Sequence, residues 1–222
     1  MISQMKTATV QACDFIVEPS QSPAEKAHRI NSFRKNAMLP LTNKINKLIP
    51  DLNWIYKQGH DVQLGYALIY ATLKGDSGAV KALLESGANP NVVDDEGTPV
   101  IVLATMCNRI RIVSHLLNAG AQVDLPTVLG DNALMWAASL SEVTIAKMLI
   151  DAGADVNARN FSGSTALMFA SASGSMRIAR MLVNNGAWIL FEDEWQHTAI
   201  DIARMCGNNN IADYLFKRHF CY

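Results

Sequence analysis

The sequence predicts an all-α solenoid of stacked helix-turn-helix units, joined by short β-hairpin or loop fingers and preceded by a helical extension. Three kinds of position recur every 33 residues. A solenoid of such units makes surface by stacking and does not fold around a pocket, so this period indicates binding. The positions are Ala71, Ala104, Ala137, Ala170 and Ala203, the pairs Gly87-Ala88, Gly120-Ala121, Gly153-Ala154 and Gly186-Ala187, and the doublets Leu83-Leu84, Leu116-Leu117, Leu149-Ile150, Leu182-Val183 and Leu215-Phe216.

Residues 164–196 show how one unit is built. Ala170 and Ser171 are small where two helices approach closely, and Gly174 predicts the end of the first helix because glycine adopts a left-handed cap without steric cost. Ile178 and Leu182 belong to an apolar stripe that predicts a second helix, which ends at Gly186. We expect the same layout in five units, 65–97, 98–130, 131–163, 164–196 and 197–222.

Two further segments precede these units. Residues 39–64 predict a degenerate N-terminal capping repeat, since one face of a terminal repeat is exposed to solvent and its sequence departs from the repeat pattern. Residues 1–38 predict an N-terminal extension with one helix over about 23–38, which begins with the capping box Ser22-Pro23-Ala24-Glu25. Ile30, Phe33 and Ala37 form the apolar face of that helix, and its basic residues are Lys26, Arg29, Arg34 and Lys35.

The chain resembles the ankyrin-repeat family over residues 65–222, and more weakly over 39–64. Thr165-Ala166-Leu167-Met168 stands where that family has Thr-Pro-Leu-His. The resemblance implies a curved stack whose partners bind along the finger tips and the concave face of the first helices. This chain departs from the family in having Ile69, Val102, Met135, Met168 and Asp201 in place of the histidine, which predicts that the histidine's hydrogen bonds are lost. Thr98-Pro99 lies one residue early in the repeat.

Mapping the family's variable positions onto the repeat gives an unusually apolar set of finger tips. Apolar tips on successive fingers indicate an interface, because the tips have little core to enter. For Trp136 and Phe169, which lie on the first helices, we favour packing between those helices over contact with a partner. A third alternative is that residues 1–38 of the same chain cover the apolar finger tips. The predicted partner-binding residues are Met106, Val128, Leu129, Leu140, Phe161, Trp195 and Met205.

Composition excludes several function classes. The formal net charge of −1 gives no global attraction to nucleic acid or to an anionic membrane. The four cysteines form no CxxC pair, no histidine pair has metal-ligand spacing, and no phosphate loop or nucleophile motif is present, so we expect no metal, cofactor or catalytic residue. The sequence has neither a secretory leader nor a membrane span, which predicts a cytoplasmic protein. Asn157 has the spacing of hydroxylation sites seen in some ankyrin proteins, but we favour the simpler explanation that it caps the hairpin.

The sequence therefore predicts a non-enzymatic adaptor that binds a peptide or an amphipathic helix of another protein, in an oligomeric state that it leaves open. One alternative is a bacterial effector, delivered into a host cytosol, or an immunity-type inhibitor that uses the same surface. A second alternative places a ligand-binding or catalytic role on residues 1–64, although so short a segment is small for an independent catalytic fold.

Overall fold

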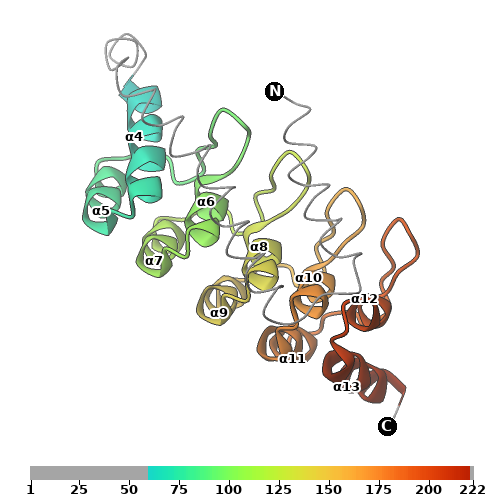
Figure 1. Ribbon diagram of the computed structural model, residues 1–222. Coiled ribbons are helices and arrows are strands. Elements are labelled where there is room, and N and C mark those ends of the chain that lie inside the picture. Colours follow the sequence, from blue (N-terminus) through green and yellow to red (C-terminus); the bar gives the residue numbers. More distant parts are fainter. Residues whose placement is uncertain (1–59, 221–222) are drawn as a thin grey trace.

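The computed structural model describes residues 60–220, with side chains from Leu64 onward. Within this range, ten helices form five helix-turn-helix pairs that lie side by side, and four fingers project to one side of the stack (Figure 1). None of these helices is both long and apolar enough to cross a membrane. The pairs are α4 (His60–Lys74) with α5 (Ser77–Glu85), α6 (Val100–Met106) with α7 (Ile110–Asn118), α8 (Ala133–Ser139) with α9 (Val143–Asp151), α10 (Ala166–Ser173) with α11 (Met176–Asn184), and α12 (Ala199–Met205) with α13 (Asn209–Phe220).

The core runs along the stack between the first helices, which we call the inner helices, and the second or outer helices. The recurring alanines are buried in it, from Ala71 to Ala203, so that successive inner helices approach closely. The leucines Leu116, Leu149, Leu182 and Leu215 are fully buried at the matching position of the last four outer helices. The 33-residue period is therefore the period of the packing, which confirms the predicted helical solenoid.

The turn between the two helices of each pair adopts a left-handed conformation at one fixed position. Gly174 has φ of 76° and ends α10, as predicted from the sequence. The matching positions include Asn108 and Ser141, with φ of 52° and 58°. The fold thus imposes this conformation whether or not the position carries glycine.

The first described helix differs from the prediction. Because α4 begins at His60 and continues to Lys74, the predicted boundary between residues 64 and 65 falls inside a helix. A Cβ atom on Gly65 would lie 3.1 Å from Cγ1 of Val92, and the Tyr66 hydroxyl donates to Oδ1 of Asp95 at 3.1 Å. Gly65 and Tyr66 of α4 therefore lie against the first finger. The remainder of the predicted capping repeat, 39–59, and the predicted extension, 1–38, lie outside the described residues.

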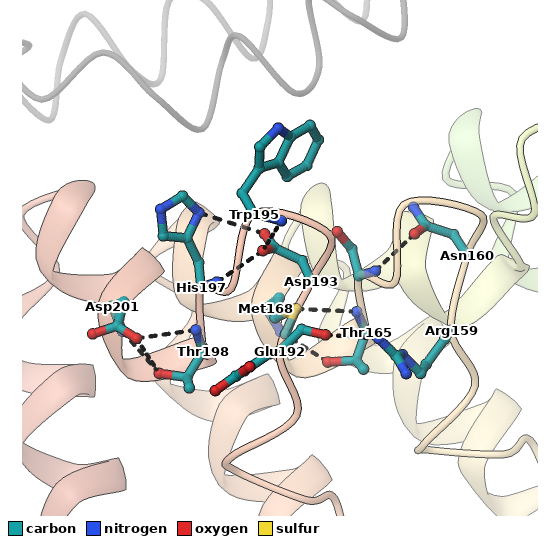
Figure 2. Close-up of polar contacts among 11 residues, drawn as sticks. Arg159, Asn160, Thr165, Met168, Glu192, Asp193, Trp195, His197, Thr198 and Asp201 are labelled. Atoms are coloured by element: carbon teal, nitrogen blue, oxygen red, sulfur yellow. Dashed lines mark hydrogen bonds and ion pairs between the residues drawn. The ribbon is translucent and has the colours of Figure 1, made fainter.

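The position of the family histidine retains hydrogen bonds in two units, contrary to the expectation of a general loss. The Thr165 amide donates to Sδ of Met168 at 3.4 Å, and the Thr198 amide donates to Oδ2 of Asp201 at 3.0 Å (Figure 2). Burial raises the pKa of Asp201, but the Thr198 hydrogen bonds together with nearby Arg204 and His197 outweigh burial, and the pKa of this carboxyl is lowered. The early Thr98-Pro99 places Pro99 at the N-cap of α6, which has no side-chain cap.

Candidate interaction surface

In three of the four fingers one polar side chain at the base accepts two backbone hydrogen bonds. Oδ1 of Asp94 accepts from the Glu96 and Thr98 amides, and Oδ1 of Asn160 accepts from the Ser162 and Ser164 amides at 3.1 and 2.8 Å. In the last finger, Oδ1 of Asp193 accepts from the amides of Trp195 and His197 at 3.0 and 2.8 Å (Figure 2). Two hydrogen bonds to one oxygen fix the turn in each of these three fingers, whereas in the second finger Oγ1 of Thr127 accepts one, from the Leu129 amide at 3.3 Å.

Neighbouring finger tips are also joined to each other. The Phe161 amide donates to the Leu129 carbonyl at 3.2 Å, and the Glu194 amide donates to the Ser162 carbonyl at 2.9 Å. A methyl group on Gly97 would stand 2.7 Å from Cγ1 of Val128, so the Val128 side chain lies directly on the preceding finger. These contacts hold the second, third and fourth tips in one register.

Arg159 ties the third finger to the fourth in a way that the sequence analysis missed. Its Nε donates to the Gly163 carbonyl at 3.1 Å, and its Nη2 donates to the Glu192 carbonyl at 2.7 Å (Figure 2). The guanidinium also lies over the Phe191 ring, 5.4 Å from its centroid. The repeat pattern does not predict this contact, because the other units carry no arginine at this position.

Three predicted anchors are exposed on consecutive fingers. Phe161 keeps 77% of its surface exposed, Val128 61% and Trp195 52%, and the Trp195 indole points away from the helices (Figure 2). Leu129, next to Val128, is half-buried. We call Val128, Leu129, Phe161 and Trp195 the finger stripe.

The other three predicted anchors lie elsewhere. Met106 and Met205 are half-buried at the last residues of α6 and α12. Leu140 is the C-cap of α8 and only 7% exposed, so it packs inside the structure and offers little contact area. The fingers enter the inner helices at the opposite end, so a seven-residue helix of about 10 Å separates these residues from the stripe. The structure does not bring the two groups together.

The inner-helix aromatics pack as favoured from the sequence. Trp136 and Phe169 are half-buried and pack against the core.

Asn157 links two units. Its Nδ2 donates to the Gly186 carbonyl at 3.0 Å, and its Oδ1 accepts from the Trp188 amide at 2.8 Å. Asp124 and Asn91 make the matching contacts one and two units earlier, accepting from the amides of Asp155 and Gln122. The capping role considered for Asn157 is therefore an inter-repeat bridge.

The apolar loop after α11 stays partly uncovered. Trp188 is 64% exposed and stacks on Phe191, with 4.9 Å between ring centroids. Leu190 is exposed and occupies the bridging position of Asn157, whereas Ile189 is buried. An open depression of about 340 Å³ lies nearby, lined by Arg159, Asn160, Phe161, Ser162, Gly163 and Glu194.

Charge is segregated between the fingers and the helices. Residues 65–222 hold fifteen acidic and eleven basic side chains, of which the fingers 89–98, 122–131, 155–164 and 188–197 carry nine acidic and one basic. Asp131 is buried in one of them, where burial raises the pKa of its carboxyl and the hydrogen bond from Nδ2 of Asn160 at 2.8 Å partly offsets the rise. The finger edge is thus acidic as well as apolar.

The described residues offer no metal site, since no three His, Cys, Asp or Glu side chains gather closely enough in this part of the chain.

Comparison with protein families gives two matches, both to ankyrin repeats. A model of three ankyrin repeats matches residues 68–160, and a model of many ankyrin repeats matches residues 149–203. No curated protein matches the chain. Ankyrin repeats generally serve as protein–protein interaction modules. The repeated helix pairs and both matches, across residues 68–203, show that this chain belongs to the ankyrin-repeat family.

Proposed function

We propose that this protein is a non-enzymatic adaptor that holds a peptide or an amphipathic helix of a partner against the finger stripe. The proposal rests on the exposure of Val128, Phe161 and Trp195 on three consecutive fingers, which are joined to one another by backbone hydrogen bonds. Monomeric soluble proteins rarely expose apolar side chains in such a row without an interaction to serve.

The geometry favours tight binding by few residues. Aromatic side chains in the centre of an interface typically supply about 2 kcal/mol or more each when they are buried by a partner. Phe161 and Trp195 retain enough exposed surface to do so. The hydrogen bonds between the tips lower the ordering cost, because the stripe is already formed before the partner arrives.

The acidic finger edge indicates the charge of the partner. With nine acidic side chains against one basic, the fingers attract a segment that carries Lys or Arg beside its apolar residues. The same charge repels phosphate, so the fingers disfavour nucleic acid. We therefore expect a basic, apolar protein segment as the ligand.

We also place the protein in the cytoplasm. Cys107 and Cys206 form no disulfide bond in the described part of the chain, which agrees with a reducing compartment.

A peptide-display selection against the full chain tests the proposal. Sixteen-residue peptides are selected, and their dissociation constants are measured by fluorescence anisotropy for the wild type, Phe161→Ala and Trp195→Ala. Loss of about 2 kcal/mol corresponds to a roughly thirtyfold weaker dissociation constant. Phe220→Ala is the matched control, because Phe220 is an exposed aromatic residue on α13, outside the fingers.

The expected result is that both finger variants weaken binding at least tenfold, while the control binds as the wild type does and all variants melt normally. Selected peptides that bind both finger variants with unchanged affinity would show that the finger stripe is not the binding surface.

A further inference from the structure

The finger stripe combines apolar side chains with an acidic border, and one segment of the same chain has the complementary composition. Residues 22–38 predict an amphipathic helix whose apolar face holds Ile30, Phe33 and Ala37. That segment carries four Lys or Arg residues and one Glu, whereas the fingers carry nine acidic residues and one Arg. The two surfaces match in polarity and oppose each other in charge.

The described structure also shows on which side the chain enters the stack. Two residues of α4 lie against the first finger, since the Tyr66 hydroxyl donates to Asp95 and Gly65 approaches Val92. α4 therefore begins at the end of the stack from which the fingers project (Figure 1).

The connection is long enough to reach the finger stripe. Residues 39–59 span up to about 70 Å when extended, at about 3.3 Å per residue. Helices pack at about 8–10 Å, so the fourth finger lies roughly 30 Å from the first. A linker that is only half extended covers that distance.

We propose that residues 22–38 occupy the finger stripe of the unbound protein and that a partner must displace them. This inference rests on the proposed function, because it assigns an intramolecular competitor to the same surface. A tethered segment acts at an effective concentration in the millimolar range, so even a weak contact keeps the stripe covered. The protein thereby selects partners whose segments bind better than its own.

A labelled synthetic peptide of residues 22–38, added to the full chain, tests this proposal. Ile30→Asp with Phe33→Asp places two charges on the apolar face of the tethered segment and releases it. His28→Asp with Ser32→Asp is the matched control, because it adds the same two charges on the opposite face of the predicted helix. Binding is followed by fluorescence anisotropy, and circular dichroism melts check that each chain is folded.

We expect the released chain to bind the peptide at least ten times more tightly than the wild type or the control. Adding Phe161→Ala to the released chain should remove that binding, and raising the salt concentration should weaken it. Equal binding to all chains, or no binding to the folded released chain, would overturn the proposal.

The display-selected peptides, measured on the same released chain, separate the two hypotheses. If they bind it through Phe161 and the 22–38 peptide does not, the intramolecular cover is wrong and the proposed function stands. If neither kind of peptide depends on Phe161, both proposals fall.

Discussion

Replacement of Ser141 by glycine should stabilise the protein. Ser141 occupies the left-handed turn between α8 and α9 with φ of 58°, where glycine is found in three of the five units. Its side chain is exposed, and its hydroxyl makes no hydrogen bond to any described residue. The substitution therefore removes backbone strain without removing a contact.

The size of the effect follows from two opposing contributions. A side chain in the left-handed region costs about 1–2 kcal/mol. Glycine adds conformational freedom to the unfolded chain, which offsets about 0.4–1 kcal/mol of that gain. We expect Ser141→Gly to raise the free energy of unfolding by about 0.5–1 kcal/mol, or roughly 2–3 °C in Tm for a chain of this length.

Urea and thermal unfolding followed by circular dichroism measure the change. Asn108→Gly is the matched control, because asparagine tolerates the same conformation and the gain should be near zero. Gly174→Ala is the reciprocal change, since its new Cβ atom would meet Oδ1 of Asn208 at 2.9 Å and keep the unfavourable φ. We expect that variant to lose at least 1 kcal/mol.

A Ser141→Gly variant that is less stable than the wild type, with Gly174→Ala unchanged, would refute the reasoning. It would mean that the turn position is not under backbone strain.

Two further predictions concern the fingers and the loops. Asp131→Asn keeps an acceptor for Asn160 and removes a buried charge, so it should raise stability at pH 7. Burial raises the native pKa of Asp131 above its unfolded value, so the wild type gains stability as pH falls through the native pKa. The stability advantage of Asp131→Asn, measured by urea titration, should therefore shrink in that pH range. An advantage that grows on acidification would contradict this. Asn157→Ala removes the hydrogen bonds to the Gly186 carbonyl and the Trp188 amide, so the free energy of unfolding should fall by about 1–2 kcal/mol. Hydrogen exchange at the Trp188 amide should become faster. Unchanged exchange would show that the Asn157 bridge does not hold this loop.

The helical framework was largely readable from the sequence, because its determinants are local and repeat. Ala104, Ala137 and Ala170 mark the buried contact of the inner helices, and Gly174 marks a turn that needs a positive φ. The first unit was placed less well, since a helix that continues through residues 60–74 leaves no sign at the predicted boundary between 64 and 65.

The candidate surface was predicted in part. Val128, Phe161 and Trp195 are exposed on the fingers, whereas Leu140 is buried and the two methionines lie at the far ends of their helices. The turn-closing position of Asp94, Asn160 and Asp193 also recurs at the 33-residue stride and could have been found from the sequence.

The sequence by itself determined the repeating unit, its turns and the acidic composition of the fingers, because each depends on residues close together in the chain. Only the tertiary structure decided which apolar side chains stay uncovered and how the fingers are joined. Arg159 reaches the Glu192 carbonyl, and the Phe161 amide reaches the Leu129 carbonyl, across about one repeat of chain. Exposure of a side chain depends on what the neighbouring unit places against it, and a periodic pattern specifies position within a unit but not that neighbour.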